Sequence, residues 1–335
     1  MNSIKKLTAL LLSVLLVFTF SACSKGEETE LTEITVCLDW TPNTNHTGIF
    51  VADALEYYKA EGIKVNIVQP PENGAELMVA SGQAQFGISF QDTLAATFAS
   101  EDPLGVTAVA AILQHNTSGI ISRKGEGIDS PKGLENKKYS TWDSPIELKI
   151  IESLMTSDGG DYSKLELIPN VVTNEAEALR NKDTDAIWIF YAWAGVQCEL
   201  SGLEFDYFNF IDIDDVFDYY TPVIISGNEF LSENPETAKA FLRATKKGYE
   251  YAIENPEAAA SILVKSDTTG SLIGSEELVT ASQKWISGQY IADAEYWGVI
   301  DTNRWDRFYN WLYEQKLIER KLDSGFGFSD DYLTQ

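Results

Sequence analysis

The sequence is poor in basic residues. Its 335 residues include 25 Lys and Arg against 51 Asp and Glu, so the formal net charge at pH 7 is −26. A chain with this charge repels phosphate backbones, and no basic patch offsets the repulsion. The same charge opposes docking of the protein surface on anionic lipid. We therefore exclude nucleic acid as a partner. If the protein is attached to a membrane, something other than its own charged surface must hold it there.

Histidine and cysteine are also scarce. The only histidines are His46 and His115, and there are three cysteines. No cluster of His and Cys has the spacing of a zinc site, and no glycine-rich phosphate loop occurs. We therefore expect no metal and no cofactor. In an exported protein Cys37 and Cys198 have the option of pairing, but a bridge between two lobes would lock a hinge, so we expect buried free thiols.

The N-terminus has the order of a secretory signal peptide. Lys5 and Lys6 precede an apolar run without charge, Leu7 to Phe20, and small residues lead from there to Cys23. This pattern predicts a signal peptide over residues 1–22. The run is too short to cross a membrane, which takes about 20 residues. The alternative, a buried core helix, lacks any partner helix nearby.

The residues before Cys23 resemble a bacterial lipobox, although Phe20 stands where that motif usually has Leu. The resemblance implies cleavage before Cys23 and a lipid on its thiol, with palmitate among the acyl chains. Two chains anchor a protein stably, at about 0.8 kcal/mol per buried CH₂. Residues 23–32 would then be the lipidated Cys and a polar tether. We expect an exported protein held on the extracytoplasmic face of the cell membrane.

The remaining chain, about 310 residues, is long enough for two domains. Apolar periodicity predicts alternating strands and helices. The first unit is predicted to hold strands at 34–38, 65–68, 85–89 and 106–113, with helices at 47–58, 74–81 and 92–100. The second is predicted to hold strands at 137–140, 165–168 and 186–189, with helices at 146–155, 175–180 and 193–200. The chain then returns through 207–211 and 222–226 and becomes mostly helical.

This alternation predicts the α/β class with parallel pairing and right-handed crossovers. Two such units joined by a chain that crosses between them describe a two-lobe, periplasmic-binding-protein-like fold of type II. We place the two crossings at the hinge near 120–123 and 220–225. Lobe I is then 33–120 plus 223–335, and lobe II is 121–222. Ligands of open α/β sheets lie at the carboxyl ends of the strands.

Several motifs resemble a known family. They include LDWTPNTNHTG at 38–48, FGISFQD at 86–92, HNTSGI at 115–120, DAIWIFYAWAG at 185–195 and YYTPVII at 219–225. Together with a long helical segment at 234–259, they resemble the thiamine-precursor-binding proteins of ABC importers. That group shares its fold with alkanesulfonate-binding proteins and with the fungal hydroxymethylpyrimidine phosphate synthase. The resemblance covers nearly all of the chain after the signal peptide.

The loop after the first strand is one candidate ligand site. Trp40 offers a flat face for stacking an aromatic ring. Asn43, Asn45 and His46 can donate and accept hydrogen bonds, which suits a heterocycle. In the fungal synthase a histidine at the place of His46 takes part in the reaction, whereas here we expect a contact only. The alternative is a loop that merely caps a helix.

Other candidates lie at later strand ends and near the second crossing. Hydroxyl and amide groups there suit a ligand, but ordinary helix capping is the alternative. The aromatic residues there are predicted to wall the pocket, with burial in the core as the alternative. These candidates are Ser89, Gln91, Thr117, Ser118, Tyr191, Trp193, Tyr219 and Tyr220.

The resemblance implies a monomeric, non-enzymatic receptor that captures a small heterocyclic ligand for ABC permease subunits. A thiamine pyrimidine precursor is the first candidate ligand. Pyrimidine binders of the family commonly have an acidic residue where this chain has Ala194, which leaves a riboflavin-like ligand or an alkanesulfonate open. A secreted synthase-like enzyme is the remaining alternative, although the chain has no cysteine-rich iron-binding segment like that expected of the fungal enzyme.

Overall fold

The two predicted units correspond to two separate β-sheets in the computed structural model, which describes residues 30–333. The predicted signal peptide and Cys23 lie outside these residues, as does most of the tether. Residues from Thr32 onward form one unit that contains both sheets. The first sheet holds β1 (Thr32–Cys37), β2 (Ile63–Val68), β3 (Phe86–Ser89), β4 (Val106–Ala111) and β10 (Val223–Gly227). The second holds β5 (Ser118–Arg123), β6 (Lys138–Thr141), β7 (Glu166–Pro169), β8 (Ala186–Phe190) and β9 (Phe205–Asn209).

The two sheets have the same topology. Their strand orders are β2-β1-β3-β10-β4 and β7-β6-β8-β5-β9. In each, the first three strands in this order run parallel, and the fourth pairs antiparallel with its neighbour in the parallel set. The α/β class is therefore confirmed, but wholly parallel pairing is wrong. The antiparallel strands β10 and β5 each follow a passage from the other sheet, so no crossover helix sets their direction.

The chain passes between the sheets through residues 112–117 and 210–222. The first passage lies earlier than predicted, because residues 120–123 belong to β5 and pair with both β8 and β9. The second passage ends at β10, close to its predicted position. We propose the lobe boundaries 33–120, 121–222 and 223–335, with the start of lobe II moved to the beginning of β5.

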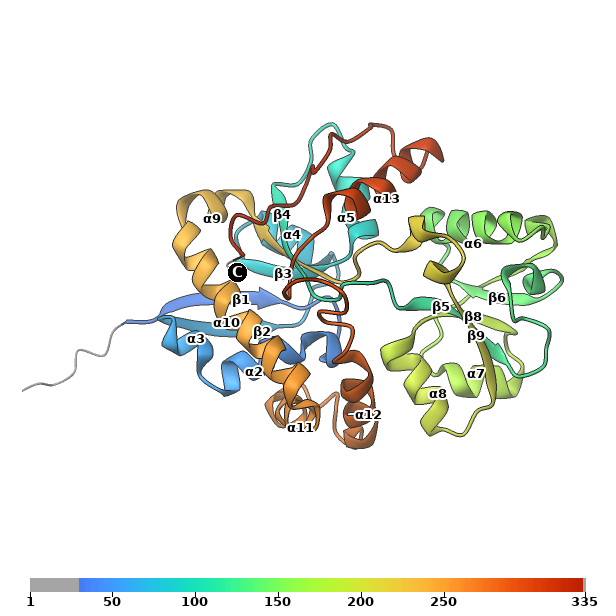
Figure 1. The fold of residues 1–335 in the computed structure, drawn as a ribbon, viewed down its shortest axis with the longest axis horizontal. Coiled ribbons are helices and arrows are strands. Elements are labelled where there is room, and N and C mark those ends of the chain that lie inside the picture. Colours follow the sequence, from blue (N-terminus) through green and yellow to red (C-terminus); the bar gives the residue numbers. More distant parts are fainter. Residues whose placement is uncertain (1–29, 334–335) are drawn as a thin grey trace, which may run out of the picture. The chain divides into compact units, whose positions relative to one another are not determined.

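Helices flank both sheets, and Figure 1 shows α10 and α2 beside the first and α6, α7 and α8 beside the second. Helices of the first group are α2 (Thr47–Ala54), α3 (Tyr57–Ala60), α4 (Gly74–Ala80), α5 (Gln91–Phe98), α9 (Asn228–Glu233), α10 (Pro235–Glu254), α11 (Pro256–Ser266), α12 (Glu276–Ile286) and α13 (Thr302–Glu314). Those of the second are α6 (Pro145–Ser157), α7 (Glu175–Asn181) and α8 (Val196–Leu200).

Two helices differ from prediction. The helix expected at 47–58 is broken at Glu56, whose φ of 59° lies in the left-handed region that few side chains adopt. The helix expected at 193–200 begins two residues earlier as a π-helical turn, η4 (Tyr191–Gly195), and continues as α8. Such π turns are rare and are frequent at functional sites.

One buried apolar cluster lies on the first sheet, and the π turn that follows β8 contacts it. A second cluster contains residues of both sheets, among them Ala108 of β4 and Ile120 of β5. Ala192 belongs to the core beside β1 and α10, and Trp193 packs against it. Cys37 and Cys198 are buried free thiols, as predicted. Among residues 30–333, none of the helices combines the length and the apolar character needed to cross a bilayer.

Candidate functional site

A cavity of about 450 Å³ lies where the first passage, the carboxyl end of the second sheet and α12 meet. This volume falls within the range of small-molecule pockets, about 300–1,000 Å³. None of its described lining residues is Lys or Arg. The lining consists of His115, Asn116, Thr117, Tyr191, Tyr207, Phe208, Asn209, Ile211, Asp212, Ile213, Trp285 and Gln289.

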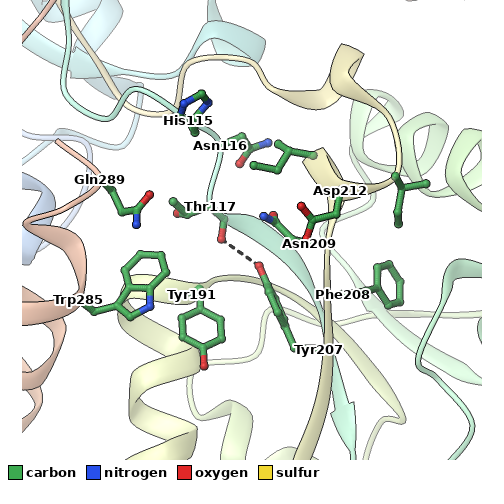
Figure 2. A pocket seen from close by; sticks show the side chains of 12 residues that line it. His115, Asn116, Thr117, Tyr191, Tyr207, Phe208, Asn209, Asp212, Trp285 and Gln289 are labelled. Atoms are coloured by element: carbon green, nitrogen blue, oxygen red, sulfur yellow. Dashed lines mark hydrogen bonds between the residues drawn. The ribbon is translucent and has the colours of Figure 1, made fainter. Parts of the chain in front are cut away.

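Three aromatic rings form a continuous wall on one side of this cavity. The ring of Tyr191 lies 4.9 Å from that of Tyr207 and 5.1 Å from that of Trp285, measured between centroids. Figure 2 shows the three rings next to one another, with Thr117 above them. Burial raises the pKa of both tyrosines, so both phenols are neutral at pH 7. The wall therefore presents uncharged π faces to a ligand.

Local sequence explains how these rings reach the cavity. Tyr191 opens the π turn directly after β8, at the carboxyl end of that strand. Tyr207 lies on β9, and its ring covers the space above Gly119, where an added Cβ would lie 2.2 Å from the Phe208 carbonyl oxygen and 2.7 Å from the Tyr207 ring. Trp285 comes from α12, whose buried face includes Val279 and Ile286. The wall thus depends on a glycine and on a helix distant in sequence.

Two polar atoms of the lining lack any hydrogen-bond partner. The Thr117 hydroxyl is buried and unpaired, and so is the side-chain oxygen of Asn209. The backbone carbonyl of Thr117 is paired, because it accepts from the Tyr191 amide at 3.0 Å and from the Tyr207 hydroxyl at 3.1 Å. A buried polar group without a partner costs about 1–3 kcal/mol. The cavity therefore offers unused hydrogen-bonding capacity.

A charged network joins the two passages beside the cavity. His115 lies 2.8 Å from Asp218 through Nδ1 and 2.9 Å from Asp293 through Nε2. Asp218 also accepts from the Asn116 amide at 3.0 Å and lies 3.3 Å from Arg304 Nε. The hydrogen bond to Asp218 is the main cause that raises the pKa of His115. The network connects both passages to the segment from Asp293 to α13.

Two of the predicted site residues, Thr117 and Tyr191, line the cavity. The loop after β1 does not line it, although it packs against α12 through Thr44 and Ser282, whose hydroxyls are 2.7 Å apart. Trp40 in this loop is 60% exposed. Its face is therefore open to solvent and free for stacking.

The polar residues of this loop hold its own conformation. Asn43 caps the short helix η1 (Thr44–His46) and accepts from the Asn45 amide. His46 is fully buried, with Nε2 2.6 Å from Asp39 and Nδ1 accepting from the Asn43 amide at 3.2 Å. Both His46 nitrogens are engaged, so this ring has no free nitrogen for a ligand. Asn45 is half-buried, and its backbone carbonyl accepts from Tyr249.

Three further predicted residues hold the fold together. Gln91 is fully buried, accepts from the Tyr220 amide at 2.9 Å and donates to the Trp305 carbonyl at 2.9 Å. The Tyr220 hydroxyl accepts from the Asp301 amide at 2.8 Å. Tyr219 stacks on Phe308, with centroids 4.1 Å apart. The structure thus assigns these side chains to packing between the second passage, α5 and α13.

The last predicted residues are also engaged internally. The Ser89 hydroxyl donates to Glu76, and Ser118 donates to Asn116 Oδ1 from both its hydroxyl and its amide. Trp193 packs on the core of the first sheet rather than on the cavity. Ala194 is buried in a small apolar cluster of the second sheet. A ligand contact of Ser89, Ser118 or Trp193 is a prediction from the sequence.

Sequence reasoning missed Tyr207, Asn209 and Trp285. Gly119, a glycine inside a buried strand, is a signal of close approach, and it marks the place that the Tyr207 ring occupies. Asn209 is the last residue of β9, and like Thr117 it is a polar side chain next to the end of a strand, which is the pattern that indicates a ligand contact. Nothing local indicates Trp285, because the contact of α12 with the π turn is set by tertiary packing.

The chain matches known proteins along most of its length. The family model described as NMT1/THI5 like matches residues 43–259. A formylaminopyrimidine-binding protein of Halalkalibacterium halodurans is 26% identical over 333 residues, which are 97% of this chain and 98% of the relative. A 4-amino-5-hydroxymethyl-2-methylpyrimidine phosphate synthase of Legionella pneumophila is 25% identical over 307 residues, 90% of this chain and 92% of the relative. These matches confirm the resemblance that the motifs predicted.

The fold also matches solved structures. The alkanesulfonate-binding protein SsuA of Xanthomonas axonopodis pv. citri, bound to MOPS, superposes with a TM-score of 0.66. The match covers 90% of this chain and 99% of that protein at 10% identity. At this identity the likeness shows the fold alone. It confirms the predicted two-lobe periplasmic-binding-protein-like fold.

Proposed function

The chain belongs to the NMT1/THI5-like family, and on this basis we propose that it is an extracytoplasmic solute receptor of an ABC importer. Its ligand is a small, flat heterocycle, with a thiamine-related pyrimidine as the first candidate. The relative named as a formylaminopyrimidine-binding protein, which aligns with nearly the whole chain, supports this proposal.

The cavity carries the proposal. A wall of three neutral aromatic rings suits a flat ring, and polar side chains around it suit the nitrogens of a heterocycle. The cavity lies beside both passages, so a hinge motion at these passages would close the two lobes around a ligand bound there. This combination of a flat apolar wall, polar rim and hinge position is what a receptor for heterocycles requires.

The same lining argues against an alkanesulfonate. Sulfonates are anions, and proteins bind anions with Arg, with Lys or with the N-terminus of a helix. The described lining contains Asp212 but neither Arg nor Lys. An anion in this cavity would therefore face the Asp212 carboxylate with no Lys or Arg to balance it, and His115, the lining residue that can carry a positive charge, already lies between Asp218 and Asp293.

A synthase-like enzyme is the second candidate, because a relative with that name aligns with 90% of the chain. The histidine contacts favour the receptor instead. His46 has both ring nitrogens engaged within its loop, and His115 lies between two carboxylates. Neither ring has a free nitrogen to act as a general base toward a bound ligand.

Attachment to the membrane belongs to the same proposal. A lipid on Cys23 would keep an acidic receptor near its permease, which its charge alone would not do. Cells fed a labelled palmitate should label the wild type, and Cys23→Ala should remove the label. A Cys23→Ala protein that stays labelled would exclude this anchor.

The proposal is tested by measuring the binding of small molecules to the purified protein. Thermal unfolding is followed with formylaminopyrimidine, thiamine, riboflavin and an alkanesulfonate in turn. A ligand at 100 times its Kd adds about 2.7 kcal/mol to stability. We expect stabilisation by a heterocycle and none by the sulfonate. No stabilisation by any heterocycle would overturn the proposal, and absorbance near 400 nm in the purified protein would favour the enzyme.

A further inference from the structure

We propose that Thr117 and Asn209 together read the polar edge of the ligand, and that this edge is an amino group beside a ring nitrogen. The inference rests on the proposed function and adds the group that the site selects. It follows from two buried polar atoms that border the cavity and have no partner, the Thr117 hydroxyl and Asn209 Oδ1.

Burial makes these two atoms significant. Thr117 is 6% exposed, so water has almost no access to it. Neither Thr117 Oγ1 nor Asn209 Oδ1 has a hydrogen-bond partner, although more than nine in ten buried polar groups in proteins have one. Both residues line the one cavity described above. We infer that a bound molecule supplies the missing partners when the two lobes close around it.

The strand register brings the two side chains to the same face of the second sheet. Asn209 pairs with Gly119, and the Thr117 carbonyl accepts from the Tyr191 amide, which continues the ladder between β5 and β8. Side chains two residues apart on a strand share a face, so Thr117 and Asn209 are diagonal neighbours, about 7–8 Å apart. Two hydrogen bonds of about 2.9 Å each and a ligand edge between them bridge this gap.

The chemistry of the two groups selects the ligand edge. An amide oxygen requires a donor, and a hydroxyl can donate to an acceptor. An aromatic ring with an amino group beside a ring nitrogen offers this donor and this acceptor next to each other. Asn recognises the same kind of edge on adenine in DNA.

The experiment compares two ligands and three variants. The ligands are 4-amino-5-hydroxymethyl-2-methylpyrimidine and its analogue with hydrogen in place of the amino group. The variants are Thr117→Val, Asn209→Leu and the control Thr221→Val. Thr221 Oγ1 is also buried and unpaired but does not border the cavity. Calorimetry gives each Kd, and thermal unfolding without ligand gives each Tm. Asn209→Ala replaces Asn209→Leu if that variant does not fold.

We expect the wild type to bind the amino compound at least about tenfold tighter than the analogue, or about 1.4 kcal/mol. Asn209→Leu should bring this ratio close to one. Thr117→Val should weaken both ligands about tenfold and leave Tm unchanged or higher, because the lost hydroxyl has no bond in the free protein. Thr221→Val should have the same effect on Tm as Thr117→Val but should leave the Kd of both ligands unchanged.

Two results would overturn the inference and leave the receptor in place. One is an unchanged ratio between the two ligands in Asn209→Leu, and the other is wild-type affinity in Thr117→Val. A protein that binds riboflavin but neither pyrimidine would also overturn it. If the wild type binds no heterocycle at all, the proposed function itself fails, so the two failures are distinguishable.

Discussion

Gln91 was predicted from the sequence as a ligand contact, and the structure predicts a different phenotype for its replacement. Its side chain joins the second passage to α13, through Tyr220 on one side and Trp305 on the other. Gln91→Leu keeps nearly the same volume but removes both hydrogen bonds. We expect a protein that is less stable and that still binds its ligand below its melting temperature.

The expected loss follows from the two partners of the Gln91 side chain. The Tyr220 amide loses its acceptor while buried, at a cost of about 1–3 kcal/mol. Trp305 lies inside α13, where its carbonyl also has a helical partner, so that loss is one ordinary bond, about 0.5–1.5 kcal/mol. The sum is about 1.5–4.5 kcal/mol. For a chain of this length, whose unfolding entropy is about 0.6 kcal/mol/K, it lowers Tm by roughly 2–7 °C.

Circular dichroism gives the Tm of Gln91→Leu, and calorimetry at 15 °C gives its Kd for whichever heterocycle the wild type binds. Gln83→Leu, at an exposed position, is the matched control and should melt like the wild type. If Gln91→Leu also melts like the wild type but has lost its affinity, Gln91 is a ligand residue and the structural reasoning is refuted.

Three further predictions concern the wall and the titrating groups. Gly119→Ala should cost at least about 1–3 kcal/mol of stability and at least tenfold in affinity by calorimetry, since its Cβ would lie 2.2 Å from the Phe208 carbonyl oxygen and 2.7 Å from the Tyr207 ring, so that β9 must shift; wild-type affinity would contradict this. Burial raises the pKa of Asp92 to about 6, so the folded state retains a proton that the unfolded state has lost, and stability falls as the pH rises from about 4 to 6. Urea titrations at several pH values give the free energy of unfolding, and in Asp92→Asn its fall between pH 4 and 6 should be smaller by about 1–3 kcal/mol. The same pH dependence as in the wild type would refute this prediction. The raised pKa of His115 adds stability that is complete below pH 6.5 and is lost as the pH rises through the pKa of the folded state. His115→Gln should therefore lower the free energy of unfolding more at pH 6 than at pH 9. Equal losses at the two pH values would count against the contact with Asp218.

The helices and strands were predictable because the pattern that indicates them lies within a short stretch of sequence. Apolar residues at a period of two or of 3.6 mark strands and helices without reference to the rest of the chain. The predicted strand at 186–189 lies within β8, and the predicted helix at 146–155 lies within α6. The break at Glu56 was not predictable in this way, because a left-handed residue other than glycine leaves no trace in the apolar pattern.

The candidate site was predicted only in part because polar side chains near strand ends have two uses. Thr117 and Gln91 both lie near strand ends, and both were assigned to the ligand from the sequence. In the structure Thr117 borders the cavity with an unpaired hydroxyl. The side-chain amide of Gln91, in contrast, forms hydrogen bonds with the backbone of Tyr220 and Trp305. Which use applies depends on the partners nearby, and those partners come from distant parts of the chain.

The sequence by itself determined the α/β class, the family and the acidic character of the chain, because composition, periodicity and motifs are properties of consecutive residues. Only the tertiary structure decided where β5 and β10 pair and which residues form the cavity. Trp285 and Tyr191 are far apart along the chain, and their rings lie 5.1 Å apart because α12 packs against the π turn. That contact depends on how two sheets and their helices pack together, which no local pattern records.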